Sequence, residues 1–277
     1  MTDVDSNIAD CDGLEICYLT AGDPENPPVV LLHGGGLDSA GLSWKHTIEP
    51  LADRFRVIAP DLPGYGRSDS PDAPVSMEYY VSVLGRFLDT VAIDTTALVG
   101  ISMGGGVALG FTLDHLDRVS KLVLVDSYGL GGKVPGGSLG YLFTRLGLTG
   151  LVFALLRRSR SATAFSLRSV TAGKPDEELV SEAFAELRRH GGTAWEALQQ
   201  SEVTPAGLRT NYVGKLPDLE VQTLLVHGER DPVVPVSWAV RAGSLIPDAV
   251  VRIMPNCGHM PPREKPDQFE ALVQSFL

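Results

Sequence analysis

Short runs of apolar and β-branched residues recur along the chain, and each run ends at turn-forming residues. Most of these runs are apolar at every position, which is typical of strands buried on both faces of a sheet. We therefore predict seven strands, at Leu14–Thr20, Val29–Leu32, Arg56–Ala59, Thr95–Val99, Lys121–Val125, Val221–Val226 and Val250–Met254.

Helix-like segments separate most of these strands, because their apolar residues repeat at helical spacing. The clearest are Met77–Ala92, Gly104–His115, Pro235–Leu245 and Asp267–Leu277. Alternating strands and helices imply βαβ units and a mostly parallel sheet. No helix joins the first two predicted strands, so we expect an antiparallel edge there.

The alternation breaks between about Ser127 and Leu219. This span contains no convincing strand, and its clearest helices are Pro175–Arg189 and Ala194–Gln200. A helical insertion at this point is typical of a lid over the carboxyl ends of the strands. We predict a core domain formed by residues 1–127 and 216–277, with a helical cap over residues 128–215.

Charge and composition narrow the classes of protein. The chain has 277 residues, 44% of them hydrophobic, and a net charge of −11. An acidic surface repels phosphate backbones, so we expect no nucleic-acid partner. Arg157, Arg158 and Arg160 are the one basic cluster, which we interpret as a solvated helix end.

Several features favour a cytoplasmic location with no membrane partner. The three cysteines are too few for a disulfide framework. The segment Met1–Asp10 is acidic and lacks the apolar run of a signal peptide. The most apolar later stretch, Tyr141–Leu156, is interrupted by Arg145 and glycines and is too short to span a bilayer.

The sequence Gly100-Ile101-Ser102-Met103-Gly104 lies between a predicted strand and a predicted helix. A sharp turn at such a junction needs flanking glycines, because a Cβ atom there would clash. The turn lifts the Ser102 hydroxyl clear of the sheet, at a helix N-terminus that favours developing negative charge. Ser102 is therefore the candidate nucleophile.

A serine hydroxyl needs a base to take its proton. His259 follows the last predicted strand, so it reaches the same edge of the sheet as Ser102. The other histidines fit worse. His115 ends a helix on the wrong side, His46 and His190 look solvated, and His33 and His227 are interpreted as turn residues at strand ends.

The base in turn needs a carboxylate to orient it. Asp231 follows the strand Val221–Val226, and the order Ser102, Asp231, His259 fits this role. Asp126, at the end of Lys121–Val125, is a rival that we interpret instead as a turn or hinge residue.

An oxyanion needs two backbone N–H donors. We assign Met103, which follows the nucleophile, and Gly35 in His33-Gly34-Gly35-Gly36, with Gly36 as an alternative. Gly36, Ile101 and Met260 are predicted to line the substrate pocket. Leu139–Phe143 and Leu146–Leu156 of the cap should bury an apolar face and add to a mainly apolar cavity.

Other chemistries have weaker support. Cys257 lies beside His259 but lacks a nucleophile turn. No cluster of cysteine, histidine and aspartate has convincing metal-binding spacing. Gly104-Gly105-Gly106 is not followed by the residues of a nucleotide-binding loop.

Taken together, these motifs resemble those of the α/β-hydrolase superfamily. The resemblance covers almost everything outside the cap: His33 to Gly36, Asp61 to Asp69, Gly100 to Gly104, Asp231-Pro232 and Gly258-His259. It implies an α/β fold with a mostly parallel eight-stranded sheet flanked by helices, an inserted helical cap and no cofactor. It also implies a serine hydrolase with a small-molecule substrate, while a homodimer remains open.

Within the superfamily, Ser102 differs from the aspartate of haloalkane dehalogenases and epoxide hydrolases. The triple glycine and Ser-Met-Gly-Gly resemble the meta-cleavage-product hydrolases, which break carbon–carbon bonds. Those enzymes have asparagine where this chain has Ile101, tryptophan where it has Met260, and a dienolate-binding cap arginine where it has Ala183. Arg188 or Arg189 could replace that arginine.

Three functions therefore remain open. The resemblance favours a hydrolase of carboxylic esters with small or medium, mainly apolar acyl groups. The alternatives are a carbon–carbon bond hydrolase and a non-catalytic ligand-binding protein that keeps the fold.

Overall fold

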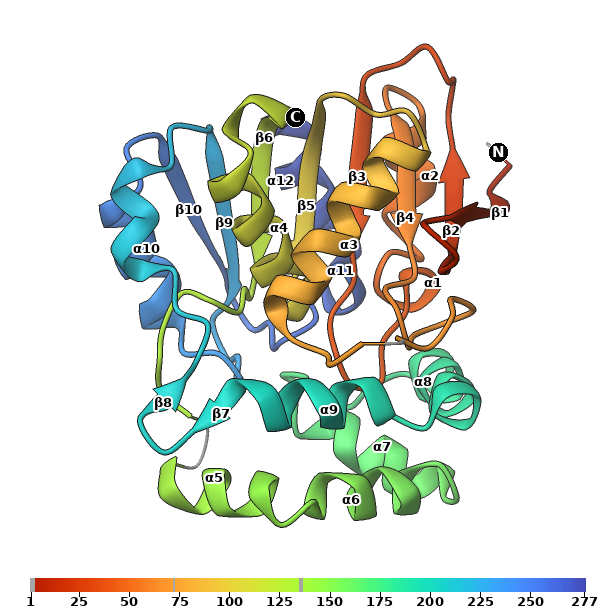
Figure 1. Cartoon of the computed structure of the whole chain (residues 1–277), viewed down its shortest axis with the longest axis vertical. Helices are drawn as coiled ribbons and strands as arrows, with labels where there is room; N and C mark the ends of the chain where they lie inside the picture. Colours follow the sequence, from red (N-terminus) through yellow and green to blue (C-terminus); the bar gives the residue numbers. More distant parts are fainter. Residues whose placement is uncertain (1–2, 72, 135–136) are drawn as a thin grey trace.

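The computed structural model describes residues 3–71, 73–134 and 137–277. Residues Met1 and Thr2 of the acidic N-terminal segment, and Pro135 and Gly136 of the proposed cap, lie outside it. Eight strands form one sheet in the order β1-β2-β4-β3-β5-β6-β9-β10 (Figure 1). Their bounds are β1 Asp5–Asp10, β2 Glu15–Ala21, β3 Pro28–Leu32, β4 Arg56–Pro60, β5 Thr96–Ile101, β6 Val119–Val125, β9 Thr223–Gly228 and β10 Ala249–Met254.

The sheet is mostly parallel, as the alternation of strands and helices predicted. Only β2 makes antiparallel pairs, with β1 on one side and β4 on the other. The first two predicted strands correspond to β2 and β3, and the expectation that they pair is wrong, because β4 lies between them. The sequence analysis missed β1, whose polar residues are those of an exposed edge strand.

Helices cover both faces of the sheet (Figure 1). Alternate residues of the central strands point into two apolar layers; on β3, for example, Val30 and Leu32 lie in one and Val29 and Leu31 in the other. The first layer holds residues of α3 (Met77–Thr90), α4 (Met103–Asp114) and α10 (Val236–Leu245). The second holds residues of α1 (Ala40–Ser43), α2 (Ile48–Ala52) and α12 (Pro266–Phe276).

The segment between β6 and β9 forms a helical layer across the carboxyl ends of the strands (Figure 1). Its helices are α5 (Gly137–Arg145), α6 (Leu148–Leu156), α7 (Arg160–Arg168), α8 (Glu177–His190) and α9 (Thr193–Glu202). The segment also contains a hairpin absent from the sequence prediction, β7 (Val203–Thr204) with β8 (Gly207–Leu208), which does not join the main sheet. Two 3₁₀ turns, Leu116–Arg118 and Val213–Asp218, and the short helix α11 (Pro261–Glu264) complete the elements.

Among the described residues, no single helix is long and apolar enough to cross a membrane. The pair α5 and α6 meets that criterion only when the two helices are counted together, and they are bent by 78° at the break between them.

Candidate functional site

Ser102 sits at a strained turn between β5 and α4. Its φ of +52° and ψ of −116° lie where L-residues are rarely found, so surrounding structure must hold it there. Glycine is required at positions 100 and 104, because backbone atoms of other residues lie too close to leave room for a Cβ atom. A Cβ on Gly100 would lie 2.3 Å from the carbonyl oxygen of Gly104, and one on Gly104 would lie 2.3 Å from that of Leu32.

The structure brings Ser102, His259 and Asp231 together in one hydrogen-bonded chain. His259 Nε2 lies 3.0 Å from Ser102 Oγ, and His259 Nδ1 lies 2.7 Å from Asp231 Oδ2. The Asp231 carboxylate is fully buried, and its other oxygen accepts the N–H groups of Val233 and Val234. A fixed carboxylate of this kind can select the imidazole tautomer that accepts a proton from the serine.

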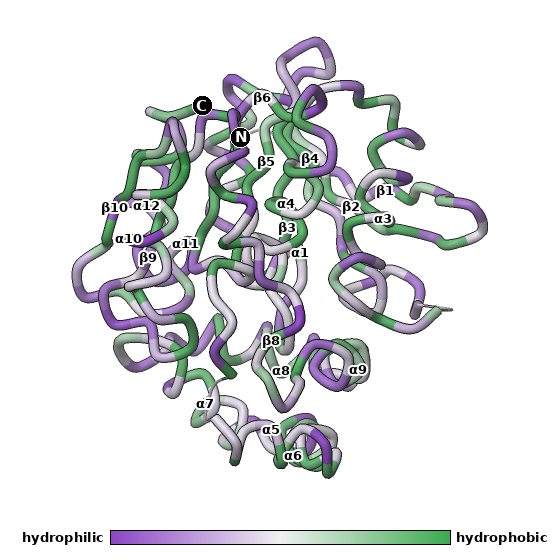
Figure 2. Tube along the Cα trace, turned by 60° about the vertical axis from the view of Figure 1, so that its left-hand side comes forward, coloured by the Kyte–Doolittle hydropathy of each residue, from purple (hydrophilic) through white to green (hydrophobic). Residues whose placement is uncertain are grey.

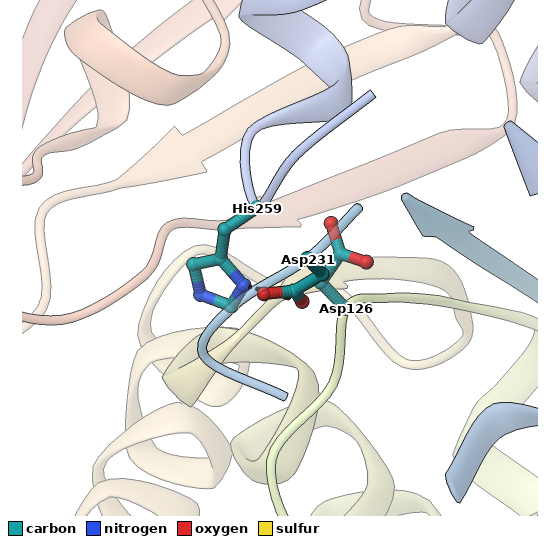
Figure 3. A group of neighbouring side chains, drawn as sticks. All are labelled: Asp126, Asp231 and His259. Carbon is teal, nitrogen blue, oxygen red and sulfur yellow. Dashed lines mark hydrogen bonds and ion pairs between the residues drawn. The ribbon is translucent and has the colours of Figure 1, made fainter. Parts of the chain in front are cut away.

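Asp126 lies next to this chain without bonding to His259 (Figure 3). Its Oδ1 accepts the N–H of Gly228 at 2.9 Å, and its Oδ2 has no hydrogen-bond partner within the described structure. Burial, together with the nearby charge of Asp231, raises the pKa of Asp126 well above its ordinary value. The structure therefore places Asp231 in contact with His259, with Asp126 behind it at a position where burial disfavours the ionised carboxylate.

Asp126, Asp231 and His259 are also the described side chains best placed to hold a metal ion, since their ligand atoms lie within 4.8 Å of one another. A cation there would compete with the contact between His259 and Asp231. The 2.7 Å hydrogen bond fits the orientation of a base better than metal ligation.

Three other histidines are more buried than the sequence suggested. His227 is buried within β9 and is not a turn residue. His33 is buried and its Nε2 accepts the N–H of Leu62, which fixes the loop after β3 against the loop after β4. His190 is half-buried against Tyr65, and desolvation lowers its pKa to about 4. The expectation that His190 is solvated is therefore wrong, because α8 turns it toward the core.

The proposed oxyanion donors flank Ser102. The N–H of Gly34 is already bonded to Asp38 Oδ2, at 2.8 Å. No hydrogen bond from the N–H of Gly35 or Met103 is found within the described parts of the chain. Met103 begins α4, where the N–H groups have no partner inside the helix. Both amides therefore stay proposed donors to a developing oxyanion.

A cavity of about 270 Å³ opens over Ser102 and His259. Gly36, Ile101 and Met260 all line it, in the positions predicted from the sequence. The remaining lining is mainly apolar and comes largely from the cap and the loop after β3: Gly34, Gly35, Leu37, Asp38, Leu42, Val152, Phe153, Leu156, Ser166, Leu167, Val170, Trp195 and Val233.

Sequence reasoning missed Trp195 of α9. A Cβ on Gly35 would lie 2.3 Å from the Trp195 ring, so the indole covers the glycine loop directly. The only sequence signal was an aromatic residue in a predicted cap helix, and such residues usually belong to the core of the cap.

Sequence reasoning also missed Glu264 of α11. Its carboxylate accepts the N–H groups of Gly258 and Met260, on either side of His259. It also accepts the N–H of Ala172 in the cap, at 2.7 Å. The N–H of His259 itself donates to the carbonyl of Val170, at 2.8 Å. The loop that carries the histidine is thus held by α11 and by the cap together.

Cys257, the rival nucleophile, is fully buried. Burial raises the pKa of its thiol far above the ordinary value, so it has no accessible thiolate.

The comparisons with known proteins agree with this geometry. Residues 29–272 match the model of the alpha/beta hydrolase family. The chain belongs to that family. It is 33% identical over 274 residues to a 2-hydroxy-6-oxo-6-(2'-aminophenyl)hexa-2,4-dienoic acid hydrolase of Metapseudomonas resinovorans, covering 96% of this chain and 88% of the relative.

Two solved structures are also similar. One is a serine hydrolase involved in carbazole degradation, with a TM-score of 0.83 at 28% identity, covering 99% of this chain and 98% of that one. The other is a membrane phospholipase A, with a TM-score of 0.81 at 29% identity, covering 99% of this chain and 85% of that one. The family and these relatives identify the chain as a hydrolase of serine type with a small-molecule substrate.

Replacing each carboxylate separately tests their roles. Asp231→Asn should lower kcat by about 10⁴-fold, because the amide misorients His259. Asp126→Asn should change kcat by less than about tenfold, because a neutral amide resembles a protonated carboxyl and asparagine tolerates the positive φ of 44° at this site. Steady-state kinetics on one ester would show a reversed order if Asp126 orients the base.

The raised pKa of Asp126 also makes a prediction about stability. An unfolded aspartate ionises near pH 4, whereas burial raises the pKa of the folded Asp126, so this group increasingly lowers the stability of the fold as pH rises above about 4. Asp126→Asn should therefore melt higher than wild type at pH 7, by roughly 2–4 °C, and the gain should vanish near pH 4. Thermal melts across this range that show the opposite trend would mean that Asp126 is ionised and stabilising.

Glu264→Gln should impair the site without removing a triad residue. A glutamine oxygen can keep the N–H groups of Gly258 and Met260, which share Oε1, but the amide nitrogen cannot accept the N–H of Ala172, so the hydrogen bond that ties the histidine loop to the cap is lost. We expect kcat to fall by roughly 10- to 100-fold with little change in KM. The matched control is Glu270→Gln on α12, whose partner Gln274 can still bond to an amide oxygen. Equal kcat values for the two variants would contradict the positioning role.

Proposed function

We propose that the protein hydrolyses carboxylic esters with neutral, mainly apolar acyl groups. In this mechanism Ser102 attacks the ester carbonyl while His259 takes its proton and Asp231 orients the imidazole. The N–H groups of Gly35 and Met103 bind the oxyanion. His259 then returns the proton to the leaving alcohol, and water hydrolyses the acyl-enzyme by the same route.

The observation that carries this proposal is the chemistry of the cavity wall. Its polar side chains are Asp38, Ser102, Ser166 and His259, and among the described lining residues there is no lysine or arginine. A carboxylate placed in such a cavity would lose its hydration without gaining a cation in return. The site therefore suits neutral substrates.

The cap arginines that could have supplied a cation are engaged or directed elsewhere. Arg189 pairs with Glu186, and Arg188 lies over the ring of Phe184. Ala183 is fully buried in an apolar cluster with Leu167 and Met260. None of the three lines the cavity.

A second candidate is the hydrolysis of a carbon–carbon bond. It is favoured by the similarity to the dienoic acid hydrolase of Metapseudomonas resinovorans, which extends over almost the whole chain. Against it stands the absence of a cation in the described cavity lining, because a dienoic acid is an anion at neutral pH.

Ser102→Ala should reduce ester turnover by about 10⁴-fold or more, because the triad acts as a unit. The melting temperature should be nearly unchanged. A fluorophosphonate probe should label the wild-type protein at Ser102, as read by peptide mass spectrometry. Labelling at another residue, or turnover that survives the substitution, would refute the assignment of the nucleophile.

A series of p-nitrophenyl esters tests the acyl preference. Each added methylene should raise kcat/KM by roughly tenfold until the cavity is filled. The matched pair is the hexanoate ester and the half-ester of adipic acid, which have acyl chains of equal length but differ in charge. The neutral ester should be strongly preferred. If the charged ester or a vinylogous dienoate were turned over faster, the carbon–carbon candidate would replace the ester proposal.

A further inference from the structure

The outer face of the cap carries an unusual amount of exposed apolar surface. Large apolar side chains more than a third exposed occur at 14 described positions, and eight of them lie within residues 139–165. These eight are Leu139, Leu142, Phe143, Leu146, Leu151, Val152, Leu155 and Phe165. The sequence analysis expected these helices to bury their apolar side chains in or near the cavity, and for most of these residues that expectation is wrong.

Seven of these eight residues lie on α5, on α6 or in the turn between them, which form the outermost layer of the molecule, and Phe165 lies on α7. Figure 1 shows α5 and α6 end to end, with α9 between them and the sheet. Figure 2 shows green, hydrophobic stretches in this same outer layer. On α6 only Thr149, Phe153 and Leu156 are buried, whereas Leu151, Val152 and Leu155 are exposed. We call the eight exposed side chains the apolar cap face.

The segment that carries the apolar cap face has only positively charged side chains of its own. Residues 127–175 contain no aspartate or glutamate, in a chain whose net charge is −11. The same residues include seven basic side chains: Lys133, Arg145, Arg157, Arg158, Arg160, Arg168 and Lys174. Of the five arginines, all exposed, only Arg160 has a carboxylate partner within the described structure, Glu177.

We propose that the apolar cap face docks on an anionic lipid surface. Apolar side chains on a helix that lies flat enter the boundary between headgroups and acyl chains, and nearby arginines attract anionic headgroups. The expectation that no membrane is involved rested on the absence of a spanning segment, which does not bear on surface binding.

The inner faces of α5 and α6 argue for lying on a membrane rather than crossing it. Thr149 Oγ1 donates to Gln199 Oε1 of α9 at 3.0 Å, and Phe153 packs with Leu187 of α8. Each of the two helices has nine residues, about 14 Å in length, and the bend between them is 78°. These contacts hold α6 against α8 and α9.

A second copy of this chain fits the same face less well. A symmetric dimer would bring the same surface of both copies together. Residues 127–175 offer no carboxylate to neutralise the partner's arginines. An anionic lipid surface supplies the missing negative charge.

The apolar cap face also reaches the cavity. Val152 belongs to the face and lines the cavity, and its neighbour Phe153 lines the cavity from the inner side of the same helix. A lipophilic substrate could thus pass from the lipid toward Ser102 along α6. Docking does not depend on which bond the site cleaves.

Sedimentation with vesicles tests the proposal. Vesicles of phosphatidylcholine with 30% phosphatidylglycerol should bind the protein. Binding should weaken when salt is added, and it should be weaker for vesicles of phosphatidylcholine alone. Leu151→Asp with Leu155→Asp should weaken binding by at least about tenfold, and Arg157→Gln with Arg158→Gln should remove most of the dependence on salt.

Matched controls separate docking from folding and from catalysis. Val240→Asp places one aspartate at an apolar position of α10 that is 55% exposed, against 62% for Leu151 and 64% for Leu155, and should bind like wild type. Ser102→Ala should also bind like wild type, so a failure of the ester proposal would leave this result standing. The Leu151 and Leu155 variant should keep wild-type turnover of a water-soluble acetate ester.

Three results would overturn the proposal. The first is no binding to anionic vesicles at low salt. The second is an equal loss of binding from Val240→Asp. The third is a dimer in sedimentation velocity that Leu151→Asp with Leu155→Asp dissociates, which would show that a second copy covers the apolar cap face.

Discussion

The turn at Ser102 is the constraint on which the rest of the site depends. Its strained backbone persists because Gly100 and Gly104 allow β5 and α4 to approach each other and the end of β3 more closely than any side chain would permit. That approach places the Ser102 hydroxyl at the carboxyl edge of the sheet. The loops after β9 and β10 end at the same edge, so His259 and Asp231 arrive there without long connections.

The cap does more than cover this edge. Glu264 ties the amides beside His259 to Ala172, and the amide of His259 donates to Val170. The position of the base is therefore coupled to the position of the cap, and a movement of the cap would disturb the hydrogen bond between His259 and Ser102. The same cap helices present apolar residues inward to the cavity and outward to the surrounding medium.

Charge is distributed in a way that links these features. The chain is acidic overall, yet the first half of the cap is basic and the cavity beneath it has no cation among its described lining residues. The distribution of charge also matters at Asp126, beside the site itself. Burial, together with the charge of Asp231, raises the pKa of Asp126 and so disfavours a second negative charge beside His259.

The sequence by itself determined the parallel sheet, the nucleophile turn and the order of Ser102, Asp231 and His259, because continuous apolar runs and glycines at a strand–helix junction are local signals. It did not determine that β4 separates β2 from β3, nor the polar edge strand β1, since strand order is set by packing between distant segments. Trp195 covers Gly35, and Glu264 joins the nearby amides of Gly258 and Met260 to Ala172 of the cap; both roles include a residue far away in the chain, so no local pattern indicates them. Whether Leu151 or Phe153 faces water was likewise decided only when α6 packed against α8 and α9, because a helix apolar on most sides has no sequence-defined inner face.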